Sequence, residues 1–170
     1  DLSDRYPRSQ VVAAAGDMTL VQVPTDPDDT ADVPGQVTGP TELLVLDVGT
    51  GEEVDSFGTM AGTCVTDREA MIACNHSGIN PHYGTFNTDD REGGLSANAD
   101  DPLVLTGVHG DYLFVTGQDG TNQVLDRAGQ VLDDDPPGAF IAMSDRYAVF
   151  TANEVGLSGP YQYAIYPISQ

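Results

Sequence analysis

Short apolar runs alternate with polar turns along the whole chain, and one such pattern recurs four times. In each copy an apolar run ends at a turn that carries Asp, and a second apolar run follows it. The four turn residues are Asp17, Asp67, Asp111 and Asp145. Flanks rich in Val, Ile, Phe and Tyr around a bend of Gly, Asp and Ser are typical of β-hairpins. The pattern therefore predicts four hairpins.

A second pair of apolar runs follows the hairpins. Residues 43–54 and 122–132 each contain Val-Leu-Asp, a Gly-containing turn and a further Val. Residues 83–87 and 161–166 occupy the same place after the second and fourth hairpins, and the chain then stops. Two antiparallel hairpins make one four-stranded sheet, the blade of a β-propeller. No apolar stripe of helical period continues beyond a turn, so we expect an all-β fold, a β-propeller or a propeller fragment with about four blades.

The repeat also sets the expected domain organisation. We expect residues 1–170 to form a single propeller-like domain. Its predicted blades cover approximately residues 10–57, 61–100, 102–135 and 138–170, the last blade being short. Long acidic loops interrupt this pattern, and loops of that length inside a compact all-β domain are either functional or mobile.

One motif in these blades resembles a known family. The segment from Val45 to Val54, Val-Leu-Asp-Val-Gly-Thr-Gly-Glu-Glu-Val, resembles the repeat of PQQ-like β-propellers, and Val124 to Leu132 is a weaker copy. That family contains quinoprotein dehydrogenases and non-enzymatic scaffolds of the cell envelope. The dehydrogenases join their blades with Trp, and this chain has none, although Phe57 is placed to take that position. The resemblance therefore implies the scaffold branch.

The same resemblance implies a larger assembly. Family members have six to eight blades, more than the four expected here. The chain could therefore form a small ring, part of a larger ring, or half of a ring that a second chain completes. We leave these alternatives open.

Charge excludes one class of partner. The 170 residues contain 27 acidic and 6 basic side chains, a formal net charge of −21, and every basic residue is Arg. A field of this sign repels nucleic acid, so we expect no nucleic-acid partner. An acidic, hydrated surface that keeps the protein soluble explains the composition, while collection of cations and adaptation to a salty medium remain alternatives.

Two cysteines indicate the compartment. Cys64 and Cys74 flank one predicted hairpin turn, where facing strands bring Cβ atoms close enough for a disulfide. Two buried free thiols are the alternative, and no CxxC motif suggests zinc. A disulfide favours an extracytoplasmic location, whether secreted, periplasmic or membrane-anchored. The chain lacks an apolar run long enough to span a bilayer and begins at Asp1, so we expect a missing targeting segment and leave an upstream anchor open.

The best candidate for a cofactor is Ca²⁺. Asp26, Asp28, Asp29 and Asp32 place hard oxygen ligands close together in the first long loop. The loop departs from the EF-hand pattern, because it lacks the mid-loop Gly and has Val37 where a bidentate Glu should stand. Calcium binding at these four carboxylates is therefore a weak candidate, and we expect no resident cofactor.

Histidines offer a weaker metal candidate. His76 and His82 lie in one region and His109 at a hairpin turn. Folding could bring them together with Asp89 or Asp90 as a transition-metal site. Isolated histidines in loops are more often only solvated.

Two functions of different classes remain. The chain has no Gly-x-Ser-x-Gly elbow, P-loop or dinucleotide fingerprint, which favours a non-enzymatic scaffold that contacts a protein partner in the cell envelope. Its expected contact residues are Ile79, Tyr83, Phe86 and Leu157. The alternative is a propeller enzyme, a hydrolase or a quinoprotein-like protein, with converging polar groups in an axial site.

Overall fold

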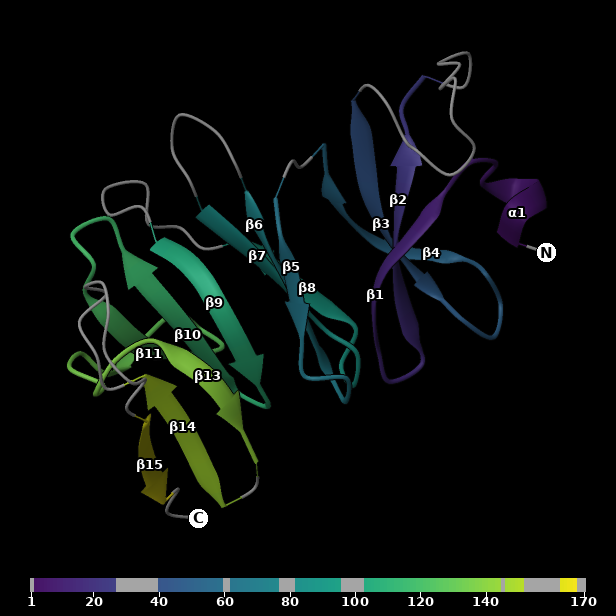
Figure 1. Ribbon diagram of the computed structural model, residues 1–170. Helices are drawn as coiled ribbons and strands as arrows, with labels where there is room; N and C mark the ends of the chain where they lie inside the picture. The colour runs from purple at the N-terminus through teal and green to yellow at the C-terminus, as the bar shows by residue number, and fades with distance from the viewer. Residues whose placement is uncertain are drawn as a thin grey trace.

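The computed structural model describes residues 2–26, 40–59, 62–76, 82–95, 103–144, 146–151 and 163–167. Within these ranges a single turn of helix, α1 (Leu2–Arg5), precedes four antiparallel sheets that follow one another along the chain. The sheets form a curved array, with the N-terminus beside the first sheet and the C-terminus beside the fourth (Figure 1). No helix in the described ranges is long and apolar enough to cross a membrane.

Strands in the first two sheets pair in chain order, each antiparallel to the next. The first sheet consists of β1 (Gln10–Ala15), β2 (Met18–Pro24), β3 (Thr41–Asp47) and β4 (Glu53–Gly58). The second sheet consists of β5 (Cys64–Thr66), β6 (Met71–His76), β7 (His82–Asn87) and β8 (Glu92–Leu95).

The last two sheets repeat the same meander, but within the described residues the fourth has only three strands. The third sheet consists of β9 (Leu103–His109), β10 (Tyr112–Gly117), β11 (Asn122–Asp126) and β12 (Val131–Asp133). The fourth sheet consists of β13 (Phe140–Met143), β14 (Tyr147–Thr151) and β15 (Tyr163–Pro167).

The arrangement of these sheets confirms the predicted fold class. All four predicted hairpins are present as β1–β2, β5–β6, β9–β10 and β13–β14. The first strands of successive sheets also contact one another, β1 with β5, β5 with β9 and β9 with β13. Sheets whose first strands gather in this way are arranged as the blades of a propeller. The chain is therefore all-β, a β-propeller or a fragment of one.

Each inner sheet buries both of its faces, and β6 shows how. Successive side chains of a strand point to opposite faces. Ile72 and Cys74 therefore pack in the core shared with the first sheet, which includes Leu20 and Val45. Met71, on the other face of β6, packs in the core shared with the third sheet. This explains why β6 is apolar at every position from Met71 to Cys74.

The interface between the third and fourth sheets depends on aromatic rings. Phe114 of β10 stacks on Phe140 of β13 with ring centroids 3.7 Å apart, and Phe150 of β14 meets the edges of both rings. A Cβ atom at Gly107 of β9 would collide with the ring of Phe140. Only glycine at this position lets the Phe140 ring lie flat against β9.

The outer face of the first sheet is covered from within the chain. Val21, Leu44 and Leu46 are buried on this face, where Tyr6 from the segment after α1 packs against them. Arg5 donates a hydrogen bond of 3.0 Å to the carbonyl oxygen of Gly51 in the β3–β4 turn. The N-terminal segment therefore shields the apolar surface at this end of the array.

The side-chain amide of Asn75 joins the second and third sheets, because it pairs with backbone groups of Leu105 as a neighbouring strand would. Its Oδ1 accepts a hydrogen bond of 2.7 Å from the backbone N–H of Leu105, and its Nδ2 donates one of 2.9 Å to the carbonyl oxygen of Leu105. Both backbone groups of Leu105 are thus satisfied at a point where the two sheets do not share a ladder. Nδ2 also lies 3.3 Å from Oγ1 of Thr63.

Replacement of Asn75 by Ala tests this junction. Asn75→Ala leaves the partly buried N–H and C=O of Leu105 unpaired, so we expect the free energy of unfolding to fall by about 1–3 kcal/mol. Thr63→Ala is the matched control, because it removes only the hydrogen bond within the second sheet and should cost less than about 0.5 kcal/mol. Urea denaturation measures both values, and equal losses in the two variants would contradict the assigned role of Asn75.

Candidate functional site

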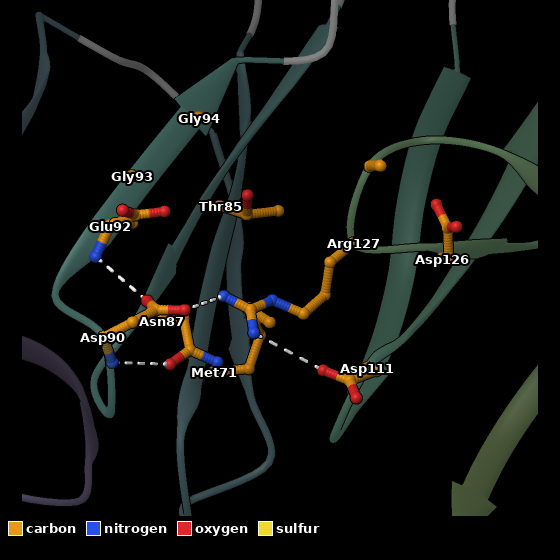
Figure 2. A pocket seen from close by; sticks show the side chains of 11 residues that line it. Met71, Thr85, Asn87, Asp90, Glu92, Gly93, Gly94, Asp111, Asp126 and Arg127 are labelled. Atoms are coloured by element: carbon orange, nitrogen blue, oxygen red, sulfur yellow. Dashed lines mark hydrogen bonds and ion pairs between the residues drawn. The ribbon is translucent and has the colours of Figure 1, made fainter.

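A cavity of about 610 Å³ opens between the second and third sheets (Figure 2). Its floor comes from β6 and β7, and one wall is β8 with the exposed backbone of Gly93 and Gly94. The opposite wall comes from the β9–β10 and β11–β12 turns. Its charged lining residues are Asp90, Glu92, Asp111, Asp126 and Arg127. The cavity is therefore rich in hydrogen-bond acceptors.

Arg127 crosses the mouth of this cavity. One of its nitrogens, Nη2, lies 2.6 Å from Oδ2 of Asp90 in the second sheet, and Nη1 lies 3.6 Å from Oδ1 of Asp111 (Figure 2). The hydrogen bond from Arg127 holds the pKa of Asp90 below its ordinary value, and the same bond raises the pKa of Arg127. Arg127 thus neutralises part of the acidic lining and ties the two sheets together.

Arg91 makes the same kind of bridge one sheet earlier. From the β7–β8 turn its Nη2 lies 2.8 Å from Oδ2 of Asp47, the last residue of β3, and 3.4 Å from Oδ2 of Asp17 in the β1–β2 turn. The pKa of Asp47 is lowered, first by the hydrogen bond from the backbone N–H of Thr50 and then by Arg91, which together outweigh the opposing effect of burial. Each arginine therefore follows the third strand of one sheet and binds a carboxylate in a turn of the sheet before it.

Asp67 organises the β5–β6 turn and links it to the third sheet. Oδ1 accepts hydrogen bonds from the backbone N–H groups of Glu69, Ala70 and Met71, and Oδ2 accepts one of 2.9 Å from Gly110. Burial acts to raise the pKa of Asp67, but these four hydrogen bonds outweigh it and lower the pKa. Asp67 is therefore a structural turn residue.

The aspartates at the turns of the other three predicted hairpins do not all have the role of Asp67. Asp17 and Asp111 lie against Arg91 and Arg127, and Asp145 lies outside the described residues. Asp67 thus accepts hydrogen bonds from the backbone of its own turn, whereas Asp17 and Asp111 belong to bridges between charged side chains. Their arginine partners are remote in sequence, so the turn pattern contained no sign of them.

The predicted histidine cluster does not form. His76 and His82 face each other across β6 and β7 with ring centroids 4.0 Å apart, whereas His109 and the β7–β8 turn residues Asp89 and Asp90 lie at the opposite ends of their strands. Throughout the described ranges no three His, Cys, Asp or Glu side chains come together as a metal site requires. Nε2 of His76 is buried and has no hydrogen-bond partner among the described residues.

The cysteine prediction is confirmed. Cys64 of β5 and Cys74 of β6 are directly paired in the ladder and form a disulfide, with Cα atoms 4.0 Å apart. Cys74 is fully buried in the core between the first and second sheets. The disulfide therefore closes the short β5–β6 hairpin. It is attached to β6, the strand that contributes side chains to the cores shared with the first and the third sheets.

The calcium candidates fall mostly outside the described residues. Asp26 follows β2 and is exposed, while Asp28, Asp29 and Asp32 lie in the part of the chain that the structure does not describe. Calcium binding by these four carboxylates stays a prediction.

Two of the expected partner contacts are core residues. Phe86 is fully buried against the first sheet, and Tyr83 is 3% exposed in the core shared with the third sheet. Burial raises the pKa of Tyr83, and the charge of Asp126 raises it further. Both lie within β7, whose alternate side chains enter the two neighbouring cores, so neither presents a contact surface. Ile79 and Leu157 lie outside the described residues.

The fourth sheet carries four of the ten large apolar side chains that are exposed among the described residues. Ile141, Tyr147, Tyr163 and Ile165 are 45%, 51%, 58% and 65% exposed. Tyr147, Tyr163 and Ile165 lie on one side of the β14–β15 ladder, which we call the outer face of the fourth sheet; it also includes Val149, which pairs with Ile165. The sequence signal was the absence of any charged residue in β13, β14 and β15, in a chain where 19% of residues are charged.

Comparisons with known proteins add a fold-level likeness. No family model matches the chain, and no curated protein matches it, so the PQQ-like resemblance stays a prediction. TolB from Acinetobacter baumannii is a similar solved structure, with 16% identity and a TM-score of 0.49. The match covers 94% of this chain but 41% of that one, so the chain spans less than half the length of TolB. A likeness at this TM-score carries no inference about function.

The histidine pair makes stability depend on pH. Burial lowers the pKa of His76 below 6.5, and the nearby His82 lowers it further. The unfolded chain then binds more protons than the folded one, so the free energy of unfolding should fall as pH drops below 6.5 and level off below the folded-state pKa. His76→Phe keeps the ring stack and should flatten this decline between about pH 7.5 and 5. Thermal melts followed by circular dichroism measure it, and identical slopes in the two proteins would refute the assignment.

Proposed function

We propose that the chain is a non-enzymatic binding module that works outside the cytoplasm and contacts a protein partner in the cell envelope. Residues 1–170 would act as a single propeller-like domain. The observation that carries the proposal is the outer face of the fourth sheet, where strand pairing places Tyr147, Tyr163 and Ile165 on one side, each more than half exposed. Contiguous exposed apolar surface on a soluble protein marks an interaction site.

The edge of the same sheet supports this role. β15 pairs with β14, and among the described residues no strand pairs with its other side, whereas the other three sheets each have a fourth strand. An open edge offers backbone N–H and C=O groups to an incoming strand. In the described part of the chain, an apolar face beside a strand edge with no paired neighbour suits recognition of another polypeptide.

The disulfide and the net charge support a location outside the cytoplasm and a partner that is a protein. The Cys64–Cys74 disulfide is typical of proteins from oxidising compartments. The net charge of −21 opposes contact with nucleic acid and keeps the rest of the surface hydrated. The uncharged fourth sheet is thus the part of the described chain where desolvation by a protein partner costs least.

A capture experiment tests the proposal. Tagged protein is cross-linked in solubilised envelope of its host, and bound proteins are identified by mass spectrometry. Ile165→Asp introduces a charge into the outer face and should reduce recovery of the partner at least about tenfold. Val131→Asp is the matched control, because Val131 is a similarly exposed strand residue, 53% exposed, on the third sheet.

The outcomes separate clearly when both variants melt at the wild-type temperature. Loss of one partner with Ile165→Asp, and its retention with Val131→Asp, supports the proposal. Equal recovery with wild type and both variants, or no specific partner at all, would overturn it.

A further inference from the structure

One repeated position differs between the second sheet and its neighbours. The third strands β3, β7 and β11 end at Asp47, Asn87 and Asp126. In each case Oδ1 of that last side chain accepts at least one hydrogen bond from a backbone N–H group of the following turn. Aspartate performs this task in the first and third sheets, so the turn itself does not require an amide in the second. What the amide adds is a hydrogen-bond donor, Nδ2 of Asn87.

This donor belongs to the lining of the cavity between the second and third sheets. Asn87 is 6% exposed and lines the cavity, and Figure 2 shows its amide group on the floor beside Met71. Oδ1 binds the backbone N–H groups of Asp89 and Asp90, whereas Nδ2 has no hydrogen-bond partner among the described residues. A donor at this depth is costly to leave unpaired. Its acceptor therefore has to enter through the cavity.

Gly94 leaves one wall of the cavity without a side chain. It pairs with Thr85, so both residues lie on one side of the sheet, and both line the cavity (Figure 2). A Cβ atom at Gly94 would meet Oγ1 of Thr85 at 3.7 Å, an ordinary van der Waals contact, whereas one at Gly93 would collide with the carboxylate of Asp55 on the other side. Packing therefore requires glycine at 93 but not at 94. In a strand, such a glycine marks a place where a ligand can approach the backbone.

The charge of the lining determines the sign of the ligand. The lining contains one cation, Arg127, and this side chain is paired with Asp90 and Asp111. The carboxylates of Glu92 and Asp126, on opposite walls, take part in none of the ion pairs of the described residues. Since no three acidic side chains come together in the described ranges as a metal site requires, separated carboxylates of this kind suit an organic cation.

We propose that this cavity binds a small organic amine that also carries an oxygen acceptor. Its ammonium group pairs with the carboxylates of Glu92 and Asp126, its oxygen accepts the hydrogen bond from Nδ2 of Asn87, and its carbon chain lies against Met71. The volume of about 610 Å³ is typical of small-molecule sites. The inference goes beyond the proposed function, because no residue of the fourth sheet lines the cavity.

Two diamines with the same carbon chain test the proposal. Cadaverine has an ammonium group at each end of its chain, and lysinamide adds a carboxamide whose oxygen can accept the hydrogen bond from Asn87. At about pH 6 both amines of each probe are charged. Isothermal titration calorimetry should show that both bind, with lysinamide about fivefold tighter, the effect of one net hydrogen bond. Lysinamide should also shift the side-chain amide resonances of Asn87 in proton–nitrogen correlation spectra.

Asn87→Asp isolates the donor. Aspartate serves as the turn acceptor at Asp47 and Asp126, so this variant should fold. It should bind cadaverine at least as tightly as wild type and lose the preference for lysinamide. Gly94→Val places a side chain in the cavity without strain in the strand and should weaken both probes at least about tenfold. Thermal melts at or above the wild-type temperature show that neither result comes from unfolding.

The ionic contacts have their own test. Glu92→Gln combined with Asp126→Asn removes the two carboxylates outside the ion pairs and should weaken both probes about three- to tenfold. Glu52→Gln combined with Glu53→Gln is the matched control, because it changes the net charge equally through exposed residues of the first sheet. This control should leave both affinities within about twofold of wild type.

N-Acetyl-lysinamide distinguishes the source of the amine. It keeps the side-chain ammonium and carbonyl oxygens of a lysine within a polypeptide but lacks the second ammonium group. Weaker binding than lysinamide assigns the site to a free amine, and equal or tighter binding assigns it to a lysine side chain of a protein; both support the cavity as an amine site. The absence of heat and of resonance shifts with every probe up to about 10 mM, or an unchanged preference in Asn87→Asp, would overturn the proposal.

Discussion

Burial of both faces of each sheet is the constraint on which the rest of this structure depends. A lone antiparallel sheet of four short strands has two faces and cannot satisfy both with its own side chains. The second and third sheets solve this by packing between neighbours, and β6 is therefore apolar from Met71 to Cys74. The first and fourth sheets each share a core with only one neighbouring sheet in the described part of the chain. Tyr6 covers the first sheet, and the fourth sheet keeps an exposed apolar face.

The sparse positive charge is placed where it joins sheets. The chain has 6 basic residues against 27 acidic ones. Two of its arginines lie in the turns after the third strands of the second and third sheets, and each bridges to the sheet before it. Arg91 and Arg127 lower the local repulsion between carboxylates that the blade geometry brings together. Polar junctions complete this arrangement through Asp67 and Asn75, which bind the backbone of the third sheet. Arg91 and Arg127 thus help the acidic sheets to pack, because these two cations lie between sheets.

Local features were predictable from the sequence, and long-range features were not. The hairpins depend on alternation and turn residues, and the Cys64–Cys74 bridge lies within one hairpin, so short segments contain enough information. The burial of Tyr83 and Phe86 depends on two neighbouring sheets covering β7, which alternation within one strand cannot reveal. The bridges from Arg91 and Arg127 join residues that are far apart in the chain. For the same reason the expected contact residues included Tyr83 and Phe86, which are buried, and none of the exposed apolar residues of the fourth sheet.

The exposed outer face of the fourth sheet depends on the packing of its other face against the third sheet. Nuclear Overhauser effects between the ring protons of Phe140 and the α-protons of Gly107 measure that contact. We expect strong cross-peaks, because the Phe140 ring lies so close to Gly107 that a Cβ atom there would collide with it. We also expect cross-peaks between the rings of Phe140 and Phe114. Absence of these cross-peaks in the folded protein, with both residues assigned, would contradict the packing and the open outer face derived from it.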